Sequence, residues 1–363
     1  MKKILIISHE ASRTGSVIQL LEFLKLHRNL NADLLFIRSG ELFPEFLELG
    51  FPTYIYAKNI LKYYLRKNKN THLILLEKLK KENYSVIYSN TILSLKLAEK
   101  LKNASNELLL HCHESKFLID FFYEKVNFEK KLEKVDRVIA VSNSVKKTLS
   151  VDYNYPLEKI KTIYPFVEID INTVKKITLA EQNIFKIGVM GNPHLVKGFD
   201  LLPYLAEVLL KKYSFYQFKI LIIGGNHETN ELSKKIKTEV KEKGLLSYFE
   251  FIDSVKNPSD YLNSFDVFAM TSRYESFSMV TLEAMLLKKP IVLFRNSGGP
   301  EEIIPEEYCF YSNHLDIESM AENIFKIYKN GIKETNYGSN SYQKFDKIKS
   351  CEMIVEQIFQ EKN

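Results

Sequence analysis

The sequence predicts an α/β protein made of two doubly wound parallel sheets, one in each half of the chain. The 363 residues exceed the length at which a single hydrophobic core usually stops growing. Short continuous apolar runs alternate with segments of helical periodicity, as in parallel sheets covered by helices on both faces. The alternation restarts after a polar interval near residue 170, which indicates a second domain of the same class.

The elements follow in order along the chain. In the first half we predict strands at 3–8, 32–38, 84–90, 107–113 and 136–142, with helices at 15–27, 71–83 and 91–103. In the second half we predict strands at 184–191, 218–225, 248–253, 266–272 and 290–296, with helices at 199–213, 231–244 and 278–289. The predicted domains are therefore 1–170 and 171–335, followed by a segment 336–363 whose amphipathic helix we expect to pack back on the first domain.

Composition limits the cell compartment and the partners. Three cysteines without a CxxC pair favour a reducing cytoplasm, and no apolar run approaches the length that spans a bilayer. Residues 1–170 hold 27 Lys and Arg against 20 Asp and Glu, whereas residues 171–363 hold 24 against 25. A basic first half suits an anionic partner, which could be a phosphate, a membrane surface or a nucleic acid. A solvated lysine-rich surface is the alternative explanation.

The stretch SRYESFSMVTLEAM (272–285) carries two carboxylates where a predicted strand passes into a helix. Glu275 lies in the loop after the strand, and Glu283 lies in the second turn of the helix. Between them, the backbone amides of residues 277–280 form a helix N-terminus, which favours anions. Both carboxylates could therefore bind the hydroxyl groups of a diphosphate-containing ligand such as a nucleotide sugar. One solvated loop charge and one exposed helix charge would produce the same spacing.

Two further segments suggest binding residues. In HCHES, His111 and His113 project from the same face of a predicted strand, and too few other ligands stand nearby for a metal site. His113 could equally be a hydrogen-bonded core histidine. In VMGNPHLVKGFDLL, Lys197 lies in the loop after the first strand of the second half, where a lysine is often merely exposed.

The segment SRYESFSMVTLEAMLLKKPIVLFRNSGGPEEI resembles the retaining glycosyltransferases of family 4, which have the GT-B fold and an E-x7-E motif. The resemblance rests on Glu275, on Glu283-Ala284-Met285, on Pro290 and on Gly298-Gly299, and extends through Lys197-Gly198 to most of residues 1–335. It implies transfer of a sugar from a nucleotide-diphosphate donor, with UDP-sugars favoured, to a glycan, lipid-linked or protein-linked acceptor in bacterial surface polysaccharide or glycoconjugate assembly. It also implies retention of anomeric configuration and no requirement for a metal or other cofactor.

The resemblance assigns roles to residues of this chain. His113, Lys197 and Glu275 are the candidate catalytic residues, with Lys197 facing the diphosphate and Glu275 holding the sugar. The remaining candidates for donor binding are Gly15, Gly191, Asn192, Phe277, Ser278, Met279, Val280 and Glu283. Glu114 is a second, less favoured candidate for the role of His113. The first domain is expected to hold the acceptor and the second domain the nucleotide sugar.

One departure from the family keeps an alternative open. The family usually has an arginine after the first loop glycine, where this chain has Asn192 after Gly191. His194 and Arg295 are candidate replacements for that cation. If none replaces it, the chain would be a catalytically weak subunit that binds and supports a partner glycosyltransferase. A nucleic-acid-binding protein is disfavoured, because no recognition motif accompanies the basic residues.

Two stretches mix aromatic, aliphatic and basic residues in the manner of membrane-surface segments. They are NILKYYLRKNKN (59–70) and KFLIDFFYEKVNFEKK (116–131). Ordinary packing within the first domain is the alternative for each. Together with the basic first half, they support a cytoplasmic protein with peripheral contact to the inner face of the membrane.

Overall fold

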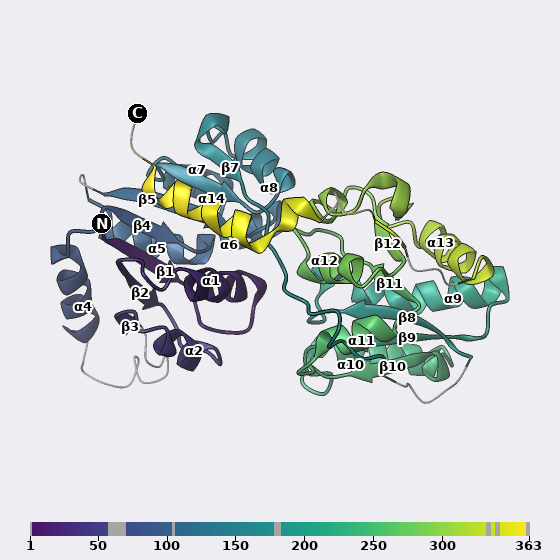
Figure 1. Cartoon of the computed structure of the whole chain (residues 1–363). Coiled ribbons are helices and arrows are strands. Elements are labelled where there is room, and N and C mark those ends of the chain that lie inside the picture. The colour runs from purple at the N-terminus through teal and green to yellow at the C-terminus, as the bar shows by residue number, and fades with distance from the viewer. Residues whose placement is uncertain are drawn as a thin grey trace. The chain divides into compact units, whose positions relative to one another are not determined.

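A computed structural model describes residues 2–56, 70–103, 106–177, 183–331, 335–337 and 342–360 of the chain. The chain forms two compact units: the first comprises Met1–Phe166 and Asp346–Asn363, and the second comprises Val167–Phe345 (Figure 1). From the sequence, the divisions were expected near residues 170 and 335. The second unit extends to Phe345 because the ring of this residue packs against the ring of Phe277, with 5.7 Å between their centroids.

The first unit is built on a seven-stranded parallel sheet with the order β3-β2-β1-β4-β5-β6-β7. Its strands are β1 (Ile4–Ser8), β2 (Ala32–Phe36), β3 (Thr53–Ile55), β4 (Val86–Ser89), β5 (Glu107–Cys112), β6 (Arg137–Ala140) and β7 (Ile160–Thr162). Most positions of the central strands are buried, because helices cover both faces of the sheet.

Helices of the first unit follow the predicted alternation. They are α1 (Gly15–Leu26), α2 (Phe43–Glu48), α4 (Asn70–Lys81), α5 (Ile92–Leu101), α6 (Lys116–Phe122), α7 (Lys125–Leu132), α8 (Asn143–Lys147) and α14 (Lys347–Phe359). Helix α14 joins the same hydrophobic core as α1 through Cys351, Ile354 and Ile358. Its ends are fixed by Lys347, which pairs with Glu22 at 2.8 Å, and by Arg137, which donates to the carbonyl of Gln357.

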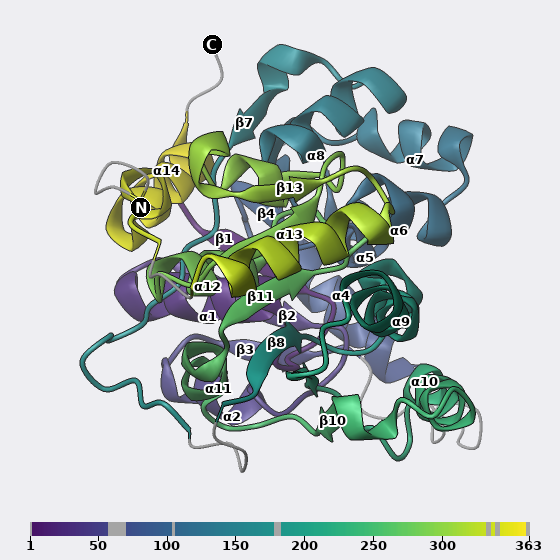
Figure 2. The ribbon, with the colours of Figure 1, turned by 90° about the vertical axis from the view of Figure 1, so that its right-hand side faces the viewer.

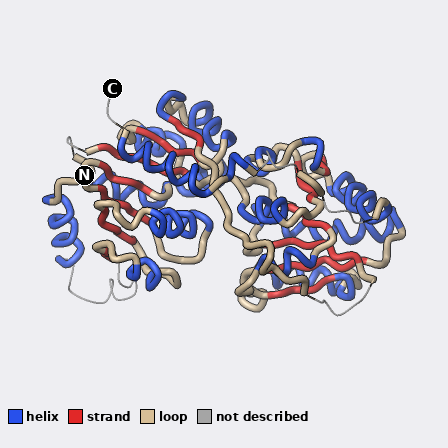
Figure 3. Tube along the Cα trace, in the orientation of Figure 1, coloured by secondary structure: helices blue, strands red, loops and turns tan. Residues whose placement is uncertain are grey.

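The second unit is built on a six-stranded parallel sheet with the order β10-β9-β8-β11-β12-β13. Its strands are β8 (Phe185–Met190), β9 (Phe218–Ile223), β10 (Phe249–Ile252), β11 (Val267–Met270), β12 (Ile291–Phe294) and β13 (Phe310–Ser312). In each unit the strands form one layer between helices (Figure 3). The prediction of an α/β protein with two doubly wound sheets is confirmed.

Helices of the second unit are α9 (Leu202–Tyr213), α10 (Glu231–Glu242), α11 (Pro258–Ser264), α12 (Met279–Leu286) and α13 (Ile317–Lys329). Side chains of α9, α10 and α13 share one hydrophobic core with the sheet, and α9 lies against α13 (Figure 2). Short 3-10 turns include Leu195–Lys197, Phe199–Leu201 and Leu246–Tyr248.

All ten predicted strands and the predicted helices are present, and three further strands, β3, β7 and β13, were not predicted. Over the described residues, none of the helices combines the length and apolar character that crossing a bilayer requires. The predicted membrane-surface stretch 59–70 lies outside the described residues, apart from Asn70 at the start of α4.

Candidate functional site

The strand order of the second sheet defines where a ligand would bind. Connections from β8 and β11 leave in opposite directions, so these neighbouring strands form the topological switch point of the sheet. Ligands of open α/β sheets collect beyond the carboxyl ends of the strands at such a point. The loops that follow β8 and β11 carry Lys197 and Glu275 respectively.

Lys197 and Glu275 meet at this position. The ammonium of Lys197 forms an ion pair with Glu275 Oε1, and the hydroxyl of Ser272 donates to the same oxygen at 2.8 Å. The Glu275 side chain is 11% exposed, whereas that of Lys197 is 36% exposed. A largely buried carboxylate thus has one exposed cation and one hydroxyl as partners, and its orientation is set before any ligand binds.

Contacts between the two loops hold this pair in place. Arg273 makes a bidentate ion pair with Asp200, both distances being 2.7 Å, and the hydroxyl of Thr271 donates to the carbonyl of Lys197 at 2.8 Å. Gly198 has a φ of +69°, and a Cβ at this position would overlap the carbonyl oxygen of Thr271. The close approach therefore requires glycine.

A third loop, which follows β12, completes the surroundings of Glu275. The amide of Glu275 donates to the carbonyl of Ser297 at 2.8 Å, and the amide of Gly299 donates to the carbonyl of Glu275 at 3.2 Å. A Cβ at Gly299 would overlap the backbone of Ser276. The Gly298-Gly299 pair seen in the sequence therefore permits backbone contact between this loop and the start of α12.

The backbone turns sharply where α12 begins. Ser278 has a φ of +91°, which is uncommon for a residue with a side chain, and its hydroxyl accepts from the amide of Thr281 at 3.3 Å. Phe277 is buried, and its ring packs on that of Phe345. Met279 and Val280 form the first turn of the helix. The four residues predicted to surround an anion thus form the capped start of α12.

Glu283 lies one turn further along α12, and its carboxyl has no hydrogen bond or ion pair among the described residues. Burial raises the pKa of Glu283 to about 7. Since none of the described residues satisfies this carboxyl, it remains available to accept hydrogen bonds from a ligand. The sequence predicted the position of Glu283, but the raised pKa became evident only from its surroundings.

The loop after β8 carries the glycine and asparagine of the prediction. Gly191 has a φ of +145°, and Asn192 is exposed beside Gly225, where a Cβ would meet Asn192 Oδ1 at 2.8 Å. Of the two cations proposed to replace a missing arginine, Arg295 is already paired with Glu306 at 2.6 Å and stacks on Tyr311. His194 uses Nδ1 to accept from the amide of Val196 at 3.2 Å.

In the first unit, His113 belongs to a histidine pair at the carboxyl end of β5, in which His111 is buried and His113 is partly buried. The rings of His111 and His113 lie 4.1 Å apart, and Nδ1 of His111 is 2.5 Å from the hydroxyl of Tyr88. Burial lowers the pKa of His111 to about 3 and lowers that of His113 well below its usual value. Neither Nε2 atom has a partner among the described residues. Both rings are therefore neutral at pH 7, with unused polar atoms.

The ends of β1 and β4 adjoin this pair. Nδ1 of His9 lies 3.2 Å from the hydroxyl of Thr91, and Glu114 accepts from the amides of Ile92 and His113 at 3.3 and 3.0 Å. Burial raises the pKa of Glu114 to about 7. Glu114 thus caps the start of α5 and positions the backbone of His113, rather than standing free.

Gly15 is the first residue of α1, directly after β1 and its loop. Thr14 occupies the capping position but makes no hydrogen bond to the helix through its side chain. The strand order places β1 beside β4, so Gly15 lies near the switch point of the first sheet.

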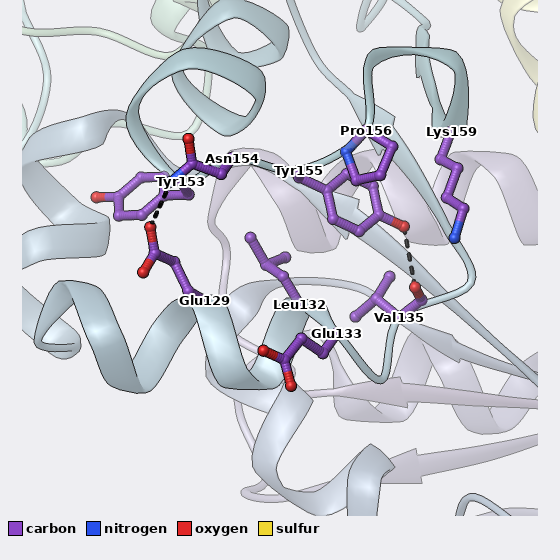
Figure 4. Close-up of a pocket in the computed structure, with 9 residues that line it drawn as sticks. All are labelled: Glu129, Leu132, Glu133, Val135, Tyr153, Asn154, Tyr155, Pro156 and Lys159. Atoms are coloured by element: carbon purple, nitrogen blue, oxygen red, sulfur yellow. Dashed lines mark hydrogen bonds between the residues drawn. The ribbon is translucent and has the colours of Figure 1, made fainter.

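A cavity of about 400 Å³ in the first unit lies away from all these residues (Figure 4). It lies beside the amino ends of β6 and β7, at the edge opposite the carboxyl ends of the strands. The lining residues are Glu129, Leu132, Glu133, Val135, Tyr153, Asn154, Tyr155, Pro156 and Lys159. Figure 4 shows that Asn154 is bonded to Glu129 and Tyr155 to the carbonyl of Val135, so these polar atoms are used within the protein.

We find no candidate metal site in the part of the chain that the structure describes. No three His, Cys, Asp or Glu side chains there form a group suited to holding an ion.

Two family models together match most of the chain. The model described as "Glycosyltransferase Family 4" matches residues 22–171, and the one described as "Glycosyl transferases group 1" matches residues 170–344. The two matches meet at residues 170–171, so together they extend without interruption from residue 22 to residue 344.

Two curated relatives illustrate the similarity. A poly(ribitol-phosphate) alpha-N-acetylglucosaminyltransferase of Staphylococcus aureus is 27% identical over 225 residues, which cover 61% of this chain but only 43% of that relative. An uncharacterized 41.2 kDa protein in the cps region of Klebsiella pneumoniae is 26% identical over 306 residues, which cover 78% of this chain and 81% of the relative.

Among solved structures, Anabaena Alr3699/HepE in complex with UDP and glucose superimposes with a TM-score of 0.81. The match covers 99% of this chain and 100% of that one, at 20% sequence identity. At this identity the comparison establishes a shared fold.

Proposed function

Because this chain belongs to the family 4 glycosyltransferases, we propose that it transfers a sugar from a nucleoside-diphosphate donor to a glycan, lipid-linked or protein-linked acceptor. We place the reaction in bacterial surface polysaccharide or glycoconjugate assembly, with a UDP-sugar as donor. The relative from the cps region of Klebsiella pneumoniae and the Anabaena complex with UDP support these choices. Retention of configuration and independence of metal are parts of the same proposal.

The observation that carries the proposal is the meeting of Lys197 and Glu275 at the switch point of the second sheet. One cation and one carboxylate lie side by side there, next to the capped start of α12. Glu283, whose carboxyl has no partner among the described residues, follows on the same helix. A nucleotide sugar presents three matching features in order: sugar hydroxyls, a diphosphate and a ribose diol.

Each group has one task in this arrangement. The ammonium of Lys197 binds the diphosphate, together with backbone amides at the start of α12. The carboxylate of Glu275 accepts hydrogen bonds from sugar hydroxyls, and that of Glu283 accepts them from the ribose. Gly15, Gly191 and Asn192 bring backbone and an amide side chain toward the phosphates, and His113 contacts the sugar or orients the reacting groups.

In the transfer step, the bond between the anomeric carbon and the diphosphate oxygen breaks while the acceptor oxygen bonds to that carbon. The acceptor proton passes to the departing phosphate, so no protein base is needed at the point of attack. Lys197 stabilises the charge that develops on the leaving diphosphate, which lowers the barrier through electrostatic preorganisation. Positioning of the two substrates supplies the rest.

Thermal unfolding with UDP, GDP, ADP and CMP, each in the absence of metal, tests the donor site. A ligand at 100 times its dissociation constant should stabilise the protein by about 2.7 kcal/mol. We expect UDP to raise the midpoint for the wild type and to raise it much less for Lys197→Ala. Lys234→Ala is the matched control, because Lys234 is an exposed lysine of α10 paired with Glu231. An equal shift for Lys197→Ala and wild type would contradict the role of Lys197.

Asn192 favours a second candidate function, a binding subunit that supports a partner glycosyltransferase. Arg295, one proposed replacement for the usual arginine, is paired with Glu306 instead. Hydrolysis of UDP-glucose or sugar transfer by the isolated chain would exclude this candidate. Stabilisation by UDP without any turnover across a panel of UDP-sugars and acceptors would favour it.

A further inference from the structure

Helices α6 and α7 of the first unit present an exposed apolar surface. Phe121 is 71% exposed, Phe122 is 45% exposed and Val126 is 59% exposed, and Phe117 lies one turn before Phe121 on α6. The rings of Phe121 and Phe122 are in edge-to-face contact, with 5.1 Å between their centroids. We call this set of four residues the α6–α7 surface.

The opposite faces of the same helices hold them to the domain. Ile119 of α6 and Phe128 and Leu132 of α7 are buried, so each helix already has a core-facing side. The four residues of the α6–α7 surface lie outside these positions. Apolar side chains that lie exposed next to one another mark an interaction site more often than scattered ones do.

Of the lysines on α6 and α7, Lys125 and Lys130 form no ion pair shorter than 3.9 Å among the described residues. Asp120 is bound by Lys116 at 2.7 Å and by the hydroxyl of Tyr153 at 2.6 Å, and Glu124 accepts from Asn127. Lys130, one turn after Val126, is exposed and forms no ion pair among the described residues. The approach of Lys125 to Glu129 is a long 3.9 Å.

The place of the surface in the fold connects it with the proposed acceptor. Helix α6 begins at Lys116, two residues after Glu114, and β5 ends at Cys112. The α6–α7 surface is therefore joined by a short segment to the strand edge where His113 lies.

We propose that the α6–α7 surface docks on an anionic lipid bilayer, with Phe121, Phe122 and Val126 entering the headgroup region. Exposed aromatic rings flanked by lysines match the boundary between apolar chains and anionic headgroups. The first half of the chain also carries the basic excess of the protein, although five of its basic residues fall between positions 58 and 69, outside the described residues. Docking would bring the strand edge of His113 to a lipid-linked acceptor; this last step rests on the proposed function, whereas the docking does not.

Tryptophan fluorescence provides a direct test on the full chain, because the protein contains no tryptophan. In Phe121→Trp the single indole would report the surface. With vesicles of phosphatidylcholine containing about one-third phosphatidylglycerol, we expect a blue-shifted emission and quenching by brominated acyl chains. Tyr216→Trp is the control, because Tyr216 is 58% exposed in the second unit, and its emission should not change. An unchanged spectrum for Phe121→Trp would overturn the proposal.

Cosedimentation with the same vesicles tests the contribution of each group. Phe121→Ser combined with Phe122→Ser should weaken binding at least about tenfold, because two apolar rings are lost. Lys125→Gln combined with Lys130→Gln should weaken binding severalfold on anionic vesicles, with little effect on pure phosphatidylcholine. Leu246→Ser, an exposed apolar residue of the second unit, should bind as the wild type does.

The same experiments distinguish a lipid bilayer from a protein partner at this surface. A wild type that binds neither vesicle but whose dimerisation is abolished by the phenylalanine changes would show a protein interface and overturn the proposal. The UDP-induced thermal shift, measured on every variant, separates the two proposals. A normal shift without vesicle binding would reject docking alone, and vesicle binding without any nucleotide shift would reject the donor site alone.

Discussion

Lys197 and Glu275, 78 positions apart in the chain, form an ion pair between loops that leave the neighbouring strands β8 and β11. In the proposed function, this contact joins the cation that would bind the diphosphate to the carboxylate that would bind the sugar, before any ligand is present. A donor would thus enter a site whose two main charges already neutralise each other. Binding of its diphosphate would require Lys197 to share its ammonium between the phosphates and Glu275.

The energy of this pair should be small in the free protein. Because the Lys197 side chain is more than one-third exposed, solvent screening limits the coupling to about 1 kcal/mol or less. A double-mutant cycle with Lys197→Ala and Glu275→Gln, followed by thermal unfolding without ligand, measures it. A coupling well above that value would show that the pair holds the two loops together by itself.

Gly198 should be far more sensitive than an ordinary loop glycine. Gly198→Ala forces a side chain into a φ of +69° and against the carbonyl oxygen of Thr271, so we expect a loss of about 2 kcal/mol or more. It should also reduce the thermal shift with UDP, since Lys197 is the preceding residue. Gly244→Ala is the matched control: its φ is +67°, but no atom lies within 4 Å of the added Cβ. Equal losses would mean that backbone conformation, not the contact with Thr271, sets the cost.

The sequence predicted the long buried strands because each is a continuous apolar run between polar segments. It did not predict β3, β7 or β13, since three residues at a sheet edge provide too short a pattern. Glu275 and Glu283 could be located from the transition of strand to helix. The partners of Glu275, and the contact of Tyr88 with His111, depend on loops and strands brought together by tertiary folding, which no local pattern encodes.

Glu283 should make nucleotide binding depend on pH. Its folded pKa of about 7 lies above its usual value, so the carboxylate form proposed to accept ribose hydrogen bonds is depleted as pH falls below 7. If only the ionised form binds, affinity at pH 6 should be about tenfold lower than at pH 8. Titration calorimetry with UDP-glucose measures this, because its diphosphate has no proton to gain in this range. For Glu283→Gln, affinity should be low and nearly independent of pH.

The same raised pKa has the opposite effect on stability. A carboxyl whose folded pKa exceeds its unfolded value stabilises the fold when protonated, and this contribution is lost as pH rises through about 7. Glu283→Gln should therefore be more stable than wild type at pH 8, by about 3 kcal/mol, and similar to it at pH 4. A variant that is less stable at pH 8 would indicate that a protein group binds the carboxylate.

His111 should make the first unit sensitive to acid. Burial lowers its folded pKa to about 3, so the unfolded chain takes up a proton near pH 6.5 while the folded protein does not. The stability due to this group is therefore complete above pH 6.5 and decreases as pH falls toward 3. At pH 5 the decrease should be about 2 kcal/mol. Glu114 acts in the opposite direction, since burial raises its pKa to about 7 and its protonation favours the fold.

The variant His111→Gln separates the effect of His111 on stability from the opposing effect of Glu114. His111→Gln cannot be protonated but can still bond to the hydroxyl of Tyr88, so it should be less stable than wild type at pH 7 and lose less stability between pH 7 and pH 5. The difference between the two proteins at each pH, from denaturant unfolding of the full chain, removes the contribution of Glu114, which both share. His27→Gln is the control, because His27 lies at the end of α1, away from β5, and should leave the slope unchanged. Parallel pH profiles for wild type and His111→Gln would mean that His111 can be protonated in the folded protein, and its ring would then have to move out of contact with His113.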